Sequence, residues 1–127
     1  MALAMLASAA TGGLLVQGLH AQTKPPVYFV AEIDVSDPEN YGKEYAPKAQ
    51  ANIKSHGGRF LAIGGSAATG AKVTSFSGDP PKRVVIQVWD SMEKIQTWQN
   101  DPEYKEIRKI GEKYAKFRGF AVDGLPQ

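Results

Sequence analysis

Hydrophobic and polar residues alternate along residues 27–35, in the segment VYFVAEIDV. A period of two is typical of a β-strand, because successive side chains point to opposite faces of a sheet. One face of the predicted strand is apolar throughout, and the other face is mixed, since it carries Tyr28, Val30, Glu32 and Asp34. The pattern therefore predicts a strand that packs one face against a hydrophobic core.

Residues 37–56 have the period of an amphipathic helix. The triplet Asp37-Pro38-Glu39 is a helix start, since aspartate accepts hydrogen bonds from free N–H groups and proline fits the first turn. A stripe predicted to be buried then recurs every fourth residue, at Tyr41, Tyr45, Ala49 and Ile53. Pro47 predicts a kink inside this helix, and Gly57-Gly58 predicts its end.

The rest of the chain predicts further strands and a second helical region. Strands are expected at residues 59–63, near 72–77, at 83–89 and at 117–122, with the glycine-rich loop GGSAATGA after the first of them. Asp90 with Glu93 forms a capping box and predicts a helix start. The triplet Asp101-Pro102-Glu103 repeats the earlier start signal and predicts that the helix resumes there.

The predicted order of elements is β-α-β-β-α-β, the ferredoxin-like plan of the α+β class. In this plan both helices cover one face of a four- or five-stranded antiparallel sheet. The residues assigned to the uncovered face are Tyr28, Val30, Glu32, Val85, Gln87 and Trp89. Because this face is too apolar to remain in water, a homodimer is predicted in which two sheets pack face to face around a barrel-like interior.

Composition restricts the classes of function. The 127 residues carry a formal net charge of +2 and contain no cysteine, and a chain of this length suits one domain. Disulfides, zinc–thiolate sites and thiol nucleophiles are therefore excluded. Lysines are interspersed with Glu and Asp, so there is no basic stripe for a phosphate backbone, and nucleic acid is not an expected partner.

The N-terminal segment is apolar, and no Lys, Arg, Asp or Glu precedes Lys24. Its Leu19-His20-Ala21 ending predicts a secretory signal peptide cleaved after Ala21, and hence a periplasmic or secreted protein without a stable membrane anchor. An uncleaved anchor and a cytoplasmic protein are the alternatives, although the apolar run is shorter than the ~20 residues of a spanning helix. The predicted division is a signal peptide at 1–21, a linker at 22–26 and a ferredoxin-like domain at 27–127.

Glu32 is the residue on which the candidate site depends, because a carboxylate in the middle of a strand is costly unless it is paired or reached by water. Arg59 and Arg83 begin strands and are the candidate partners for an ion pair inside the dimer. The alternative is a small ligand cavity, since an aromatic wall with a few convergent polar groups is typical of such sites. The residues predicted to line that cavity are Tyr28, Glu32, Arg59, Gln87 and Trp89.

His56 is the single histidine outside the predicted signal peptide. Its place at a helix C-terminus has a structural explanation, because the helix dipole favours an imidazolium there. The functional alternative is a general base at the mouth of a pocket. One histidine cannot form a three-histidine metal site, and no Asp and Glu cluster has the spacing of a calcium loop, so no metal or cofactor is expected.

Three blocks of the sequence resemble a known family: YFVAEIDVSDPENYGKEYAPKA, HGGRFLAIGG and PPKRVVIQVWDSMEKIQTWQNDPEYKEIRK. They are similar, in the same order, to blocks of the domain-of-unknown-function family numbered 1330, within the dimeric α/β barrel superfamily. The likeness spans residues 27 to about 120, and the SAATGA loop is longer than in the typical member. The resemblance implies the fold and dimerisation. Superfamily relatives include cofactor-free monooxygenases and haem-binding or haem-degrading proteins, an analogy of fold alone.

Two classes of function remain open from the sequence. The favoured one is a binding or interaction module, an exported dimer whose interior holds a small, partly apolar molecule. The alternative is a cofactor-independent enzyme of monooxygenase or isomerase type, with Glu32 or His56 as base and an arginine that holds an anionic substrate. A single histidine and the lack of a recognisable Ser–His–Asp set favour the binding module.

Overall fold

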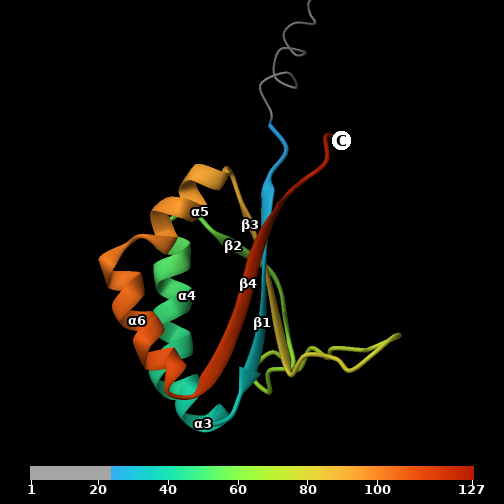
Figure 1. Cartoon of the computed structure of the whole chain (residues 1–127), viewed down its shortest axis with the longest axis vertical. Coiled ribbons are helices and arrows are strands. Elements are labelled where there is room, and N and C mark those ends of the chain that lie inside the picture. Colours follow the sequence, from blue (N-terminus) through green and yellow to red (C-terminus); the bar gives the residue numbers. More distant parts are fainter. Residues whose placement is uncertain (1–23) are drawn as a thin grey trace, which may run out of the picture.

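The computed structural model describes residues 24–127, so the predicted signal peptide lies outside the described residues. A four-stranded antiparallel sheet has the order β2-β3-β1-β4. Its strands are β1 (Val27–Val35), β2 (Arg59–Gly64), β3 (Arg83–Trp89) and β4 (Ala115–Asp123). The helices of the described residues lie on one side of this sheet (Figure 1). The predicted ferredoxin-like fold is thereby confirmed, with β1 in the centre of the sheet.

The first predicted helix forms as three consecutive segments, α3 (Pro38–Asn40), η2 (Tyr41–Tyr45) and α4 (Ala46–Ser55). Asp37 caps its start as predicted, because its Oδ1 accepts the backbone N–H of Asn40 at 3.2 Å. At the other end, Gly57 has a φ of 100°, a left-handed conformation that glycine adopts without strain. The start and the end of the helix both follow the sequence signals.

A kink is predicted at Pro47, and the π-helical turn η2 ends two residues before it. Proline has no N–H to donate to the carbonyl four residues earlier. The preceding turn is wider than in an α-helix, and the N–H of Ala46 donates to the carbonyl of Tyr41. Pro47 then lies in the first turn of α4, a position that proline tolerates well.

The second helical region divides into α5 (Met92–Gln99) and α6 (Pro102–Glu112). The capping box predicted at Asp90 is wrong by one residue, because Ser91 is the N-cap and its Oγ accepts the N–H of Lys94 at 3.2 Å. Asp90 instead forms an ion pair with Nζ of Lys94, also at 3.2 Å. At the second start signal the prediction is confirmed, since Asp101 caps α6.

The strand predicted near residues 72–77 does not form, and residues 65–82 make an extended connection that we call the arm. Its two ends meet where β2 and β3 pair, since a Cβ on Gly65 would lie 2.0 Å from the carbonyl oxygen of Lys82. Between these ends the chain leaves the sheet, so residues 72–77 have no strand beside them to pair with. Figure 1 shows the arm as a projection on the side of the sheet opposite the helices.

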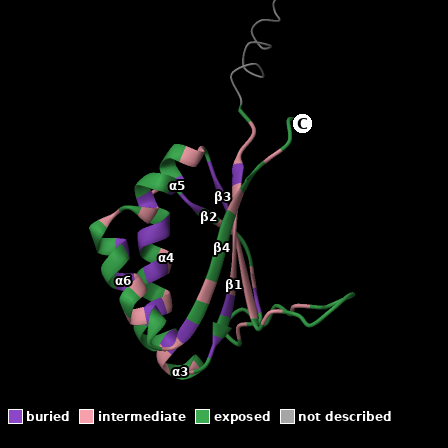
Figure 2. Ribbon diagram, in the orientation of Figure 1, coloured by how far each residue is buried: buried purple, intermediate pink, exposed green. Residues whose placement is uncertain are grey.

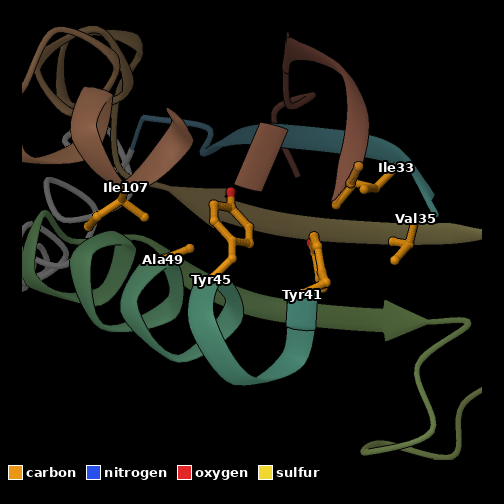
Figure 3. Packing of buried hydrophobic residues seen from close by; sticks show 7 residues of the cluster. Ile33, Val35, Tyr41, Tyr45, Ala49 and Ile107 are labelled. Carbon is orange, nitrogen blue, oxygen red and sulfur yellow. The ribbon is translucent and has the colours of Figure 1, made fainter. Parts of the chain in front are cut away.

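The core lies between the sheet and the helices, and the stripe predicted on the first helix is buried there. In Figure 3, Tyr41 and Tyr45 point from the helix into the space where Ile33 and Val35 of β1 also lie. A second cluster contains Trp98, whose ring stacks on that of Trp89 with the ring centres 5.1 Å apart. Figure 2 shows the buried residues along the surfaces where helices and sheet meet.

Candidate functional site

The sheet has one helix-covered face and one open face. Residues that pair directly across antiparallel strands point to the same face. Val27, Ile33 and Val35 are buried against the helices, so the alternate residues of β1 and their partners form the open face. The open face carries Tyr28, Val30 and Glu32 of β1, Arg59 and Ala62 of β2, Val84, Ile86 and Val88 of β3, and Arg118, Phe120 and Val122 of β4.

The face predicted for Gln87, Trp89 and Val85 is wrong, because all three lie on the helix-covered side. Trp89 pairs with Val27 and is fully buried. Its Nε1–H donates to Oε1 of Gln87 at 2.8 Å, so the two polar groups satisfy each other within the core. A shift of one residue in a strand moves every side chain to the opposite face. The assignment for β3 was shifted in this way.

Gly58 lies against the buried Trp89 ring. A Cβ on Gly58 would lie 2.6 Å from the Trp89 ring, so the second glycine of Gly57-Gly58 makes room for the indole. The residues of β3 themselves do not identify its buried face, because Val84, Ile86 and Val88 alternate with Val85, Gln87 and Trp89. Only the pairing with β1 distinguishes the two faces.

The structure does not bring the five predicted cavity residues together. Tyr28, Glu32 and Arg59 lie on the open face, whereas Gln87 and Trp89 lie on the other side of the sheet. Arg59 is level with Tyr28, since both pair with Val88. Glu32 is farther along β1 by roughly 13 Å, at about 3.3 Å per residue. Tyr28 and Arg59 are therefore at one end of the open face and Glu32 is toward the other.

Glu32 does form an ion pair, but with a residue that the sequence analysis missed. Its Oε1 accepts from Nη1 of Arg118 at 2.9 Å, across the pairing of β1 with β4. Neither predicted partner takes this role. Arg83 lies over the ring of Tyr41, 4.6 Å from its centre, and Arg59 is at the distant end of the open face.

A depression of about 400 Å³ adjoins Glu32, and we call it the Glu32 depression. It is lined by Glu32, Ile33 and Asp34 of β1, Lys116, Phe117 and Arg118 of β4, and Pro80, Pro81 and Lys82 of the arm. Its three cationic side chains exceed its two carboxylates. Lys82 pairs with Asp34 at 2.9 Å and Arg118 pairs with Glu32, while Lys116 forms no ion pair with another described residue. The ring of Phe117 lies on the core side of the sheet, against Tyr41 and Tyr45, so the apolar wall of the depression is formed by Pro80 and Pro81. The depression therefore combines a net positive charge with an apolar wall of proline.

His56 lies at the C-cap of α4, as predicted, and both of its ring nitrogens face acceptors. Nδ1 lies 2.8 Å from the carbonyl oxygen of Asn52, and Nε2 lies 3.4 Å from Oδ2 of Asp101. Both contacts join the C-terminus of α4 to the start of α6, so this geometry fits a structural link between the two helices.

Asn52 holds the carboxylates beside His56. Its Nδ2 donates to Oδ2 of Asp101 at 3.2 Å and to Oε1 of Glu103 at 3.0 Å, and its side chain is buried. The hydrogen bond from Asn52 is the main reason why the pKa of Asp101 lies below its usual 3.8, with the charge of His56 as a smaller contribution. A depression of about 650 Å³ adjoins His56 and Asp101.

Metal and membrane features can be assessed for the same part of the chain. Within residues 24–127, no three His, Asp or Glu side chains are grouped so that they could bind a metal ion. No helix in this region has both the length and the apolar character needed to cross a membrane.

The comparison with protein families decides the relationship that the three sequence blocks suggest. A family model described as "Domain of unknown function (DUF1330)" matches residues 26–125, almost the whole described part of the chain. This chain belongs to the DUF1330 family. No curated protein matches the DUF1330 chain.

Solved structures share the fold of this DUF1330 protein. One is the RPA0582 protein of unknown function from Rhodopseudomonas palustris, with 14% identity, 92% of this chain and 95% of that chain covered, and a TM-score of 0.62. Another is SnoaB, a cofactor-independent oxygenase from Streptomyces nogalater, with 13% identity, 81% of this chain and 96% of that chain covered, and a TM-score of 0.58. At this identity the likeness shows the fold, which is that of the dimeric α/β barrels.

Proposed function

We propose that this DUF1330 protein is a homodimeric binding module for small organic anions, with its binding site in the Glu32 depression. The observation that carries the proposal is the combination of charge and shape in that depression. Lys82, Lys116 and Arg118 face only two carboxylates there, beside an apolar wall. A ligand with one carboxylate and an apolar body matches both parts of this lining.

The open face supports the homodimer. Phe120 and Val122 of β4 are 42% and 53% exposed, and they continue the apolar surface of Val30 and Ile86. Contiguous apolar surface of this kind marks an interaction site in soluble proteins. A second copy brings the same apolar face, as a two-fold symmetric interface requires, and related folds are dimeric α/β barrels.

The Glu32–Arg118 ion pair leaves the depression accessible to an anion. The side chains of Glu32 and Arg118 are 34% and 72% exposed. Ion pairs at the surface stabilise proteins by about 0–1 kcal/mol. In the protomer, a ligand carboxylate can therefore displace Glu32 from Arg118 at little cost, while Lys116 supplies a second cation nearby.

The alternative function is that of a cofactor-independent oxygenase with Glu32 as the base. The observation in its favour is the fold shared with SnoaB, whose description names that activity. The two functions differ in their dependence on the Glu32 carboxylate. In a binding module this carboxylate competes with the ligand for Arg118, whereas in the enzyme it accepts a proton from the substrate.

The test of the binding site uses benzoate and octanoate as probes, with affinity measured by calorimetry. Wild-type protein should bind at least one of them, and the double variant Lys116→Ala/Arg118→Ala should weaken binding about tenfold or more, as expected for the loss of charged hydrogen bonds. Lys105→Ala/Lys109→Ala, on the exposed side of α6, is the matched control and should bind like the wild type. If neither anion binds, or if both double variants bind equally, the proposed site is wrong.

Glu32→Gln separates the module from the enzyme. It keeps the shape of the side chain and removes the charge, so a binding module should bind the anion as tightly as the wild type or more tightly. Oxygen uptake with a dihydric phenol that is lost in Glu32→Gln would favour the oxygenase instead. Native mass spectrometry of the protein purified from its own host would show whether an organic anion accompanies it.

We also propose that the protein is exported, on the basis of the uncharged N-terminal segment and its Ala21 junction. The intact mass of the periplasmic or secreted protein should correspond to a chain that begins near Gln22. Recovery of the full-length chain from the cytosol would contradict export.

A further inference from the structure

The arm is far longer than the connection between β2 and β3 requires. The two strands pair antiparallel up to Gly64 and Val84, and a turn of two residues can join such strands. Connections as long as residues 65–82 without strand or helix are uncommon in compact domains, and they are usually either functional or flexible linkers. The arm therefore calls for a role beyond chain connection.

Hydrogen bonds order the first part of the arm. The N–H of Gly65 donates to the carbonyl of Ala71 at 2.9 Å, and the hydroxyl of Thr69 donates to the carbonyl of Ile63 at 2.8 Å. At the other end, Lys82 is held to β1 through its ion pair with Asp34. These contacts attach both ends of the arm to the sheet.

The remainder of the arm is in contact with solvent. Residues 74–80 are all exposed, and Figure 2 shows the projecting segment as exposed. Phe76 is 96% exposed, which is the largest exposed fraction of any large hydrophobic residue within residues 24–127. A phenylalanine held in water is unfavourable for a monomer, because its ring gains stability only when it is buried.

We propose that in the homodimer the arm of each protomer packs against the partner, with Phe76 buried on the partner's open face. The inference rests on the homodimer of the proposed function. The arm projects on the side of the sheet opposite the helices, which is the side of the open face (Figure 1). A second copy placed on the open face lies beside the arm, and two-fold symmetry makes the contact reciprocal.

The open face offers apolar surface to receive the ring. Phe120 and Val122 remain 42% and 53% exposed there. The contact would also affect the ligand site, because Pro80, Pro81 and Lys82 of the arm line the Glu32 depression. A partner that holds the arm thereby holds one wall of that depression in place.

Photo-crosslinking tests the position of Phe76 directly, because the chain contains no cysteine. Phe76→Cys, labelled with a benzophenone maleimide, should give covalent dimers on illumination, with the crosslinks on residues of β1, β3 or β4. Mixing protein labelled with heavy isotopes and unlabelled protein distinguishes crosslinks between protomers from those within one chain. Lys105→Cys, on α6, is the matched control and should give no covalent dimer.

The dimer dissociation constant supplies the second readout. Phe76→Ser should raise it about tenfold or more, whereas Phe76→Leu, which keeps an apolar side chain, should change it little. Phe76 contacts solvent in the protomer, so neither substitution should destabilise the protomer fold. At concentrations low enough for the wild type to be monomeric, both variants should have its unfolding temperature.

The outcomes separate the inference from the proposed function. A wild-type protein that is monomeric at micromolar concentration overturns the homodimer itself. A stable wild-type dimer that gives no Phe76→Cys crosslink, or whose dissociation constant is unchanged by Phe76→Ser, overturns only the role of the arm. Loss of binding to phosphatidylglycerol vesicles in Phe76→Ser, with an unchanged dimer, would overturn it as well and assign the arm to a lipid surface.

Discussion

Gln87 and Trp89 form a self-contained polar pair inside the core. Both side chains are buried, and the indole N–H finds its acceptor on a residue of the same strand. A buried donor without an acceptor costs about 1–3 kcal/mol, so each member of the pair depends on the other. The pair stabilises the fold and has no access to a ligand on the open face.

We therefore expect Gln87→Leu to lower the free energy of unfolding by about 1–3 kcal/mol, because Nε1–H of Trp89 loses its acceptor. Urea denaturation measures the change. Gln96→Leu, on the exposed side of α5, is the control and should change the free energy by less than about 0.5 kcal/mol. A Gln87→Leu variant as stable as the wild type would contradict the role of this hydrogen bond.

The lowered pKa of Asp101 predicts how the stability of the protein changes at acid pH. Its pKa in the folded protein is below the usual 3.8, chiefly because Asn52 donates a hydrogen bond to the carboxylate. A lowered pKa means that the folded state binds the proton less readily than the unfolded state. The stabilisation is therefore complete above about pH 4 and is lost as the pH falls through the lowered pKa of Asp101.

Asp101→Asn should make the stability less dependent on pH in the acid range. Asparagine is also a good N-cap, so the substitution removes the charge and keeps the start of α6. The urea midpoint, measured from pH 5 down to about pH 2, should fall less steeply in the variant than in the wild type. Equal slopes in the two proteins would show that Asp101 does not contribute.

At the scale of elements, two glycines join the end of α4 to the start of β2. Gly57 has a φ of 100°, which brings the chain from the helix back toward the sheet. The next residue, Gly58, then passes directly over the Trp89 ring, where no Cβ fits. The two glycines therefore have different roles, one in the turn and one in the packing.

Gly57→Ala should destabilise the protein by about 1–2 kcal/mol, since a side chain disfavours the left-handed conformation. Gly42→Ala is the matched control, because Gly42 lies in the helical segment η2 and a Cβ there meets no atom within 4 Å. This control should stabilise the protein by about 0.5–1 kcal/mol. Thermal unfolding of both variants measures the difference, and a loss of stability in Gly42→Ala would contradict the argument.

At the scale of the whole molecule, the helices cover one face of the sheet and leave a broad apolar face uncovered. Val30 lies in the middle of this face, on the central strand β1, with Ile86 and Phe120 as its partners across the sheet. A charge placed there would be buried by a second copy of the chain. The cost of such a charge is several kcal/mol if it finds no partner.

Val30→Lys should therefore convert the proposed homodimer to monomers at micromolar concentration, as measured by light scattering. The control is Ala51→Lys, because Ala51 is exposed on α4, on the other side of the molecule. Dimers of equal stability in wild type and Val30→Lys would place the interface elsewhere.

The sequence alone determined the elements whose signals are local. The helix starts at Asp37 and Asp101, the end at Gly57 and the buried stripe of the first helix each depend on residues a few positions apart. Together with the order of strands and helices, these signals were sufficient for the ferredoxin-like fold. They were insufficient where two neighbouring residues could each cap the same helix, as Asp90 and Ser91 could at the start of α5.

The tertiary structure decided the features that depend on pairing between distant segments. Arg118 is the partner of Glu32 only because β4 pairs with β1, and Trp89 is buried only because it pairs with Val27. The physical reason is that both faces of β3 carry large apolar residues, so its alternation does not distinguish the two sides, and a shift of one residue reverses them all. The candidate cavity depended on that one choice. The Glu32 depression instead required the spatial arrangement of β1, β4 and the arm.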